Sequence, residues 1–188
     1  AVVSTQSTWG PTMLAVTLLS LLATSTASPI AKRNNDAPAY VQKNLGLQGQ
    51  DYEIINLARN LESLELNYWN QGLDNFTDDD FAQAGYPGFR RYVELFRDQE
   101  IAHFTALNDA LGGGFENCTY KFPVTNPYEF ISVAQVVTTV GEGAFIGASG
   151  LLGNSEARQT GSEIIGNEAR QNSYLRQTID LNFFNAVN

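Results

Sequence analysis

The sequence contains little histidine, cysteine and positive charge. Its 188 residues include one His and one Cys. A single Cys excludes a framework of disulfide bonds within the chain, and a single His excludes a metal site with several His ligands. Lys and Arg total 11 against 20 Asp and Glu, which gives a formal net charge of −9. This balance argues against nucleic acid as a partner, because phosphates are held by clustered Lys and Arg side chains.

The apolar content, in contrast, is sufficient for a packed core. Hydrophobic residues make up 43% of the chain, which excludes a wholly disordered protein. The length corresponds to one ordinary domain. Because only one His is available, any catalytic or metal-binding site must be built mostly from carboxylates.

The N-terminal 33 residues have the pattern of an export segment. An apolar run at residues 14–23 is followed by small residues up to Ser28. The run is shorter than the ~20 residues that span a bilayer and is typical of a signal peptide. We expect translation to start at Met13, so that residues 1–33 comprise an upstream stretch, the signal peptide and a short propeptide ending at Lys32-Arg33. Alternatively, the apolar run forms an N-terminal helix of the domain. The alternative for Lys32-Arg33 is a pair of solvated charges in a linker.

The mature chain is therefore expected to be secreted, either extracellular or in the cell wall, without a transmembrane segment. Residues 34–50 are predicted to form a linker and residues 51–180 the folded domain. Residues 181–188 carry no helix stop signal, and a C-terminal truncation is one interpretation of this ending.

Two glycosylation sequons fit the secretory route. They begin at Asn75 and Asn117, and both are predicted to lie in loops. The second sequon contains Cys118, the lone cysteine. Two interpretations apply to this thiol: a disulfide bond to another chain, or, as the favoured one, a buried and unreactive side chain.

Helical periodicity recurs along the rest of the chain. Apolar residues spaced by three and four predict long helices over about 51–71, 89–111, 128–152 and 155–177. The acidic run at 78–80 predicts a short capped helix over 78–84, with a calcium loop as the less favoured alternative. Residues 131–140 are rich in Val and Thr, so a β-strand is an alternative there.

The connection between the second and third long helices is unusually long. The segment 112–127 can extend over about 50 Å, whereas a helix of about 23 residues is about 35 Å long. The chain can therefore return along the bundle, so that these two helices run parallel. One such crossover is characteristic of ferritin-like four-helix bundles. The predicted fold is all-α, a ferritin-like four-helix bundle with a long crossover between helices 2 and 3.

The pair Glu100 and His103 is the sharpest local signal. Residues at i and i+3 share a helix face, and this pair continues an apolar stripe on the predicted second helix. A carboxylate inside a bundle is costly unless it is paired or binds a metal. The other interpretation is a surface Glu beside a partly buried His. Dimetal sites in such bundles use one Glu from each of two helices and Glu-x-x-His from the other two. Glu62, Glu100, His103 and Glu168 fill four of these six roles.

Four sequence blocks resemble a known family. The chain is similar to the secreted ferritin-like domain proteins of fungi, a group of stress-response and sexual-development proteins related to desiccation-associated proteins. The resemblance implies a stress- or development-associated role. It rests on these blocks in this order: residues 54–69, residues 98–112, residues 140–148 and residues 164–170.

Two departures from the family pattern bear on the chemistry. The fourth block has Gln171 where the family usually has His, and the third-helix carboxylate of many relatives falls at Thr138, with Glu142 one turn later. Whether the protein is an enzyme therefore stays open, because the second Glu-x-x-His motif that a di-iron oxidase site needs is missing. The metal candidates are Glu62, Glu100, His103, Glu142, Glu168 and Gln171, with iron, manganese or no metal as the cofactor. Instead of binding metal, the buried carboxylates could form hydrogen bonds with Arg170 or Tyr side chains. The alternative function is that of a non-enzymatic extracellular structural glycoprotein without metal.

Overall fold

A computed structural model describes residues 44–113 and 116–179. The regular elements of this part are α2 (Gly49–Asn75), α3 (Asp78–Gln83), α4 (Arg90–Ala110), α5 (Pro127–Ser149) and α6 (Ser155–Ile179). The predicted helices therefore form, and the all-α fold is confirmed. The alternative β-strand at 131–140 is wrong, since these residues lie inside α5. The predicted export segment, residues 1–33, lies outside the described residues, as does the C-terminal ending.

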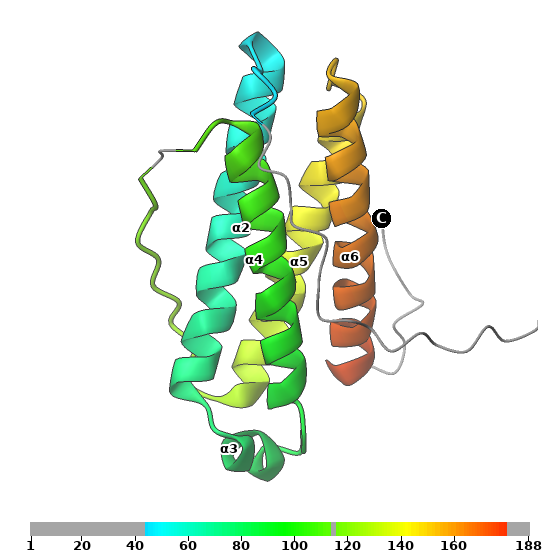
Figure 1. Cartoon of the computed structure of the whole chain (residues 1–188). Coiled ribbons are helices and arrows are strands. Elements are labelled where there is room, and N and C mark those ends of the chain that lie inside the picture. The colour runs from blue at the N-terminus through cyan, green and yellow to red at the C-terminus, as the bar shows by residue number, and fades with distance from the viewer. Residues whose placement is uncertain (1–43, 114–115, 180–188) are drawn as a thin grey trace, which may run out of the picture. The chain divides into compact units, whose positions relative to one another are not determined.

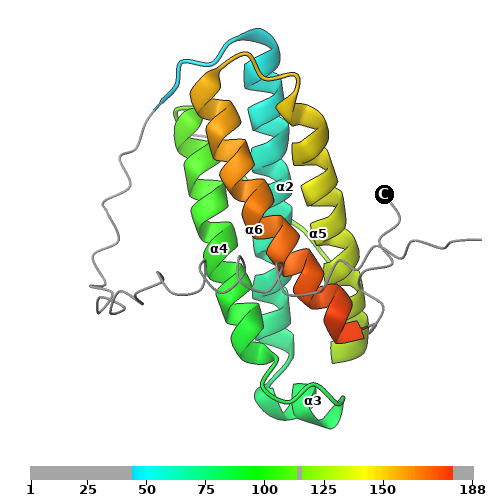
Figure 2. The same cartoon turned by 90° about the vertical axis from the view of Figure 1, so that its right-hand side faces the viewer.

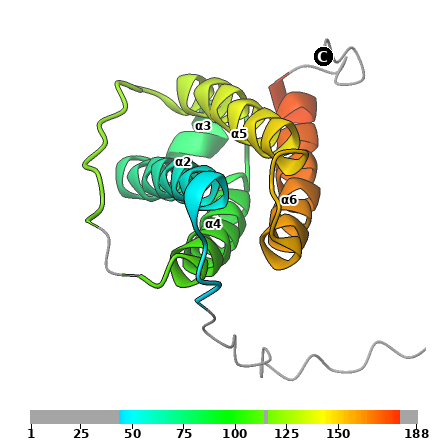
Figure 3. The ribbon, with the colours of Figure 1, turned by 90° about the horizontal axis from the view of Figure 1, so that it is seen from above.

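The four long helices form a bundle with one crossover (Figure 1). Helix α2 runs antiparallel to α4, and α5 runs antiparallel to α6, as two adjacent pairs (Figures 2 and 3). The described part of the crossover segment, residues 116–126, returns along α2, so α4 and α5 run in the same direction. This is the predicted topology.

Polar contacts hold the crossover segment against α2. The side-chain amide of Gln71 donates to the carbonyl of Phe122 at 2.8 Å, and the backbone N–H of Phe122 donates to the Gln71 Oε1 at 3.2 Å. The Tyr120 hydroxyl donates to the carbonyl of Asn60 at 3.2 Å. The two Gln71 bonds satisfy backbone groups of the extended segment, and the Tyr120 bond ties its side chain to a carbonyl of α2.

The helix starts follow local capping chemistry. The Thr77 hydroxyl accepts from the Asp80 N–H while the Asp80 carboxylate accepts from the Thr77 N–H, which is a capping box. The acidic run thus caps α3, as the favoured interpretation predicted. Asn126 caps α5 ahead of Pro127, and Asn154 accepts two N–H groups from the first turn of α6.

Helix α2 continues through Gly72, although the sequence predicted its end at about residue 71. A Cβ at this buried glycine would lie 2.1 Å from the Phe130 ring. Gly72 therefore serves close packing between α2 and α5 rather than helix termination, and α2 ends at Asn75. As a consequence, the sequon residue Asn75 is the last residue of a helix and not a loop residue.

The core consists of two apolar clusters separated by a polar layer. One cluster is aromatic and lies toward the C-terminal end of α2, where Tyr68, Trp69 and Phe130 meet. The other lies toward its N-terminal end and includes Ile55, Leu107 and Ile164. The polar layer holds buried charged side chains at the middle of α2, α4 and α6. Burial of this kind needs a compensating interaction.

Helix α5 is the most apolar element described. Among the helices described, α5 is long and apolar enough to cross a membrane. Core helices of water-soluble proteins also meet these criteria of length and composition. One side of α5 packs into the bundle through Phe130, Ile131, Ala134 and Phe145. The other side exposes Val136, Val140 and Ile146. This composition alone is weak evidence for a span.

Candidate metal centre

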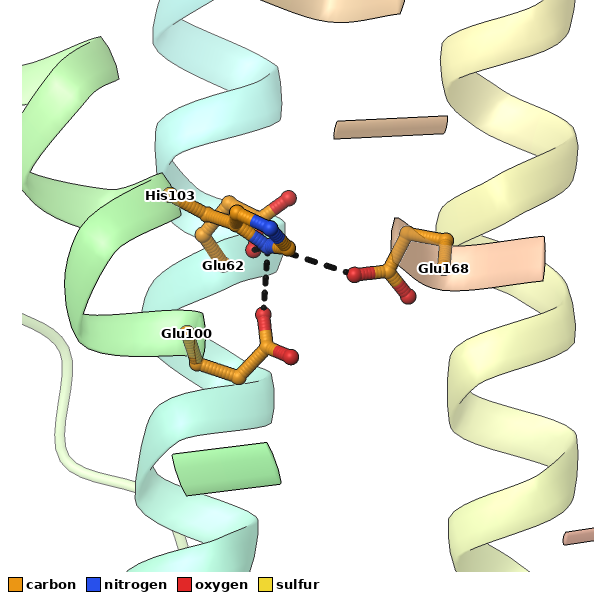
Figure 4. Close-up of side chains that lie close together, drawn as sticks. All are labelled: Glu62, Glu100, His103 and Glu168. Atoms are coloured by element: carbon orange, nitrogen blue, oxygen red, sulfur yellow. Dashed lines mark hydrogen bonds and ion pairs between the residues drawn. The ribbon is translucent and has the colours of Figure 1, made fainter. Parts of the chain in front are cut away.

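Three helices bring a histidine and three carboxylates together in the polar layer. Glu62 comes from α2, Glu100 and His103 from α4, and Glu168 from α6 (Figure 4). All four side chains are buried, with at most 4% of their surface exposed. Glu100 and His103 are one turn apart and share the inward face of α4, because residues at i and i+3 align on a helix.

His103 is the centre of this cluster. Its Nδ1 lies 3.0 Å from Glu100 Oε2, 3.2 Å from Glu62 Oε2 and 3.3 Å from Glu168 Oε1. On the other side of the ring, His103 Nε2 lies 3.1 Å from the side-chain nitrogen of Asn167. The Asn167 amide nitrogen donates to Nε2 of a neutral imidazole, and this contact orients the ring.

The electrostatics of the cluster favour a cation. Burial alone would lower the pKa of His103, but its bonds to Glu100, Glu168 and Glu62 raise that pKa to about 12. Burial raises the pKa of Glu168 to about 7 and holds the pKa of Glu62 well above its usual range. Burial also acts on Glu100, but hydrogen bonds from His103, the Glu62 carboxyl and Gln171 lower the pKa of this group. The site thus attracts positive charge, as protons or as a metal ion.

The atoms present fit a single metal ion. One ligand atom from each of Glu62, Glu100, His103 and Glu168 lies within 4.8 Å of the other three. Metal–ligand bonds to nitrogen and oxygen are about 2.0–2.2 Å, so opposite ligands of one ion stand about 4 Å apart. Glu62 Oε1 and Glu168 Oε2 are buried without a hydrogen bond, whereas Glu168 Oε1 is paired with His103. One imidazole with three carboxylates suits iron, manganese or zinc.

The other two sequence-predicted residues take different places. Gln171 lies beside the cluster and donates through Nε2 to Glu100 Oε1 at 2.5 Å and to Gln99 at 3.1 Å. Glu142 is only half-buried and accepts a hydrogen bond from Asn172 at 2.8 Å. It is not one of the four residues whose ligand atoms converge. Arg170, expected as a partner of Glu168, donates to Asn167.

One carboxylate of the polar layer, Glu65, is not among the predicted metal ligands. Glu65 of α2 is 2% exposed, and burial together with the nearby Glu168 holds its pKa well above the usual range. Its carboxylate occupies the space beside Gly141 of α5, where a Cβ would lie 2.2 Å from Glu65 Oε1. The signal was in the sequence, since Glu62 and Glu65 have the i, i+3 spacing of one helix face.

The glycosylation candidates are accessible. Asn75 and Asn117 are both exposed. Asn117 lies in the crossover segment, and its Oδ1 accepts from the buried Arg59 guanidinium at 2.6 Å. Cys118 is exposed as well, so the favoured interpretation of a buried thiol is wrong. The extended crossover segment carries Cys118 on the outside of the bundle and does not bury it.

Comparison with known proteins agrees with this architecture. Residues 50–181 match the ferritin-like domain family. Over 129 residues the chain is 31% identical to protein rds1 of the fission yeast Schizosaccharomyces pombe. The aligned part covers 68% of this chain and 32% of the yeast protein, so the chain spans about a third of that relative. The chain belongs to the ferritin-like domain family.

Proposed function

We propose that this is a secreted ferritin-like domain protein that binds one iron or manganese ion through Glu62, Glu100, His103 and Glu168. The observation that carries the proposal is the convergence of four buried ligand atoms within 4.8 Å, together with buried carboxylate oxygens that lack hydrogen bonds. Leaving such oxygens unpaired in the core costs on the order of 1–3 kcal/mol each. A metal ion would satisfy them.

The chain's own residues define what such a site can do. Glu62, Glu100 and Glu168 supply negative charge, and Asn167 orients the imidazole ring. A bound iron or manganese ion would supply Lewis acidity or one-electron chemistry. Gln171 occupies the place of a second His and is engaged with Glu100, so this site differs from a symmetric pair of Glu-x-x-His motifs.

The cellular setting is part of the same proposal. The apolar run at 14–23 supports secretion, and the exposed Asn75 and Asn117 support glycosylation. The resemblance to secreted fungal proteins supports an association with stress or development. Intact-mass analysis of the secreted protein before and after glycosidase treatment tests both sequons. An unmodified mass would contradict the secretory route.

A second candidate function is a metal-free extracellular structural glycoprotein. It is favoured by the fact that His103 already pairs with three carboxylates, while Gln171 donates to Glu100. In this case the cluster is a buried ionic network that specifies the bundle packing.

Metal analysis separates the two functions. Purified protein is incubated with Mn²⁺ or Fe²⁺, desalted and analysed by mass spectrometry for bound metal. The metal site predicts at least one ion per chain in the wild type. It also predicts loss of this ion in Glu100→Gln and His103→Gln. Glu94→Gln is the matched control, because Glu94 is an exposed acid on the same helix. Equal metal content in all four proteins would favour the structural function.

A further inference from the structure

We propose that the bundle binds a free fatty acid of about ten carbons in an apolar pocket between α2, α5 and α6, with the carboxylate of the fatty acid at Arg158. The pocket has a volume of about 220 Å³. It lies where the first half of α2, the end of α5 and the start of α6 meet at one end of the bundle (Figure 2). None of the candidate metal ligands lines this pocket, so the proposal is independent of the metal site.

The wall of the pocket is apolar. Apart from Ser149 and Arg158, all the side chains that line it are hydrophobic. The Ser149 hydroxyl donates to the carbonyl of Ile146 in its own helix at 2.8 Å, so this polar group is already satisfied. An unfilled apolar pocket is unfavourable, because its hydrocarbon surface faces water and its atoms lack packing partners. An apolar molecule that fills the pocket removes both costs.

The pocket runs from the core to the surface. Its inner wall includes Ile55, Phe145 and Gly161, which are all buried. Its rim includes Leu57 and Leu151, which are 59% and 56% exposed. A ligand with one apolar end and one polar end fits this gradient, because the apolar end is removed from water while the polar end stays in contact with it.

A single positive charge stands at the pocket. Among the described residues that line it, Arg158 is the only charged one, and it is exposed. Its guanidinium donates to the carbonyl of Gly153 at 3.4 Å and forms no ion pair in the described part of the chain. Asp51, an acid that contacts the same loop, is engaged by the N–H groups of Gly153 and Asn154 instead. Because a guanidinium binds a carboxylate through charge-assisted hydrogen bonds, the polar end of the ligand is an anion.

Small residues on all three helices create the space. They are Ala58 of α2, Ala144 and Ala148 of α5, and Gly161 of α6. Gly161 lies inside α6, where glycine is less favourable than alanine. Beyond its own helix, a Cβ at Gly161 would meet one atom within 4 Å, a ring carbon of Phe145 at the ordinary contact distance of 3.9 Å. Helix packing therefore does not require glycine at this position, and the missing side chain leaves room in the pocket.

The volume of the pocket sets the length of the chain. An apolar cavity of about 150 Å³ holds benzene, which has six carbons. By proportion, the pocket of about 220 Å³ holds about nine carbons. Nine tail carbons, with the carboxylate carbon at the rim, correspond to decanoate. A longer fatty acid would leave its extra carbons in water, where they contribute no binding energy.

A series of fatty acids of increasing length tests the proposal. Isothermal titration of the whole purified protein with hexanoate, octanoate, decanoate and dodecanoate gives one affinity for each length. Each buried CH₂ group is expected to tighten binding about fourfold, so decanoate should bind about 15-fold more tightly than octanoate. One decanoate should bind per chain. Dodecanoate should bind no more tightly than decanoate, because the pocket is already full.

Filling the pocket should shorten the preferred chain. Ala144→Leu adds three carbons within the lining, so affinity is expected to level off about three carbons earlier, and decanoate should bind about 50-fold more weakly. Ala102→Leu makes the same change at an exposed position of α4 and should leave the whole series unchanged.

Removing the charge at the rim tests the position of the carboxylate. Arg158→Gln is expected to weaken every fatty acid of the series about fivefold, the upper end for an exposed ion pair. Decanol has the same tail without the charge and should bind this variant and the wild type equally. Arg91→Gln removes an exposed charge from α4 and is the matched control. Because Arg158 is exposed, this variant keeps the proposal falsifiable even if Ala144→Leu does not fold.

Several outcomes would overturn the proposal. One is a wild type that does not bind decanoate, and another is an affinity that keeps rising beyond decanoate or is unchanged in Ala144→Leu. A dimer in analytical ultracentrifugation that excludes decanoate would assign the pocket to a second copy of the chain. Binding to phosphatidylglycerol vesicles without binding of free decanoate would assign it to a membrane surface. Loss of metal binding in the same preparations would contradict only the proposed function.

Discussion

Removing the single imidazole from the polar layer should destabilise the metal-free protein strongly, and more at high than at low pH. His103 pairs with Glu62, Glu100 and Glu168 at 3.0–3.3 Å, and all of them are buried. Breaking a buried ion pair by deleting one partner costs about 3–5 kcal/mol. For a domain of this size, that loss lowers the midpoint of thermal unfolding by roughly 10–20 °C.

The pH dependence distinguishes this mechanism from a simple packing defect. At pH 8 the His103→Gln variant must keep several carboxylates in the core without their cation. At pH 5 Glu168, with its pKa of about 7, and Glu62 and Glu65, with raised pKa values, take up protons instead. The cost should then fall to about 1–2 kcal/mol, the scale of a lost hydrogen bond.

Calorimetry in the presence of a chelator, at pH 5 and pH 8, measures both effects. Arg97→Gln is the control, since Arg97 forms an exposed pair with Asp98 and its loss should cost at most about 1 kcal/mol. An equal loss for His103→Gln at both pH values would refute the electrostatic explanation. No loss at either pH would refute the reasoning that His103 balances the carboxylates.

Three further predictions concern stability. The metal-free wild type should lose stability as the pH rises from about 4.5 to 7. The reason is the raised pKa of Glu168, which keeps a proton on the folded protein that the unfolded chain has already released. Urea unfolding that shows greater stability at pH 8 than at pH 5 would contradict this. Gly72→Ala should cost about 1–3 kcal/mol by overpacking against the Phe130 ring, and a higher unfolding midpoint in the same assay would argue against that close contact. Asp51→Ala should cost about 1–3 kcal/mol, because this carboxylate accepts the N–H groups of Gly153 and Asn154 at 2.8 Å in the loop between α5 and α6; unchanged hydrogen exchange of these two amides would contradict the assignment.

The sequence predicted the fold well because its signals are local. Apolar residues spaced by three and four define each long helix, and Thr77 and Asn126 mark helix starts through their own side chains. The crossover followed from the length of the connecting segment alone. The predicted end of α2 at about residue 71 is wrong for a tertiary reason, because the next residue, Gly72, accommodates the Phe130 ring of another helix.

The site was predictable only in part. Glu100 and His103 stand out because their i, i+3 spacing continues an apolar stripe, and the ligand pattern of dimetal four-helix bundles adds Glu62 and Glu168. Glu65 shares the helix face of Glu62, but the space that accommodates its carboxylate depends on Gly141 of a helix distant in sequence. Gln171 was expected as a weak ligand, and its engagement with Glu100 depends on how α4 and α6 pack.

Crystals grown with Mn²⁺ and measured at the manganese absorption edge provide the most direct test of the central claim. That claim is that Glu62, Glu100, His103 and Glu168 bind one ion together. The account predicts an anomalous peak within bonding distance, about 2.0–2.3 Å, of one atom from each of these side chains. A polar layer without a peak, or a peak only at the exposed acids 78–80, would contradict it.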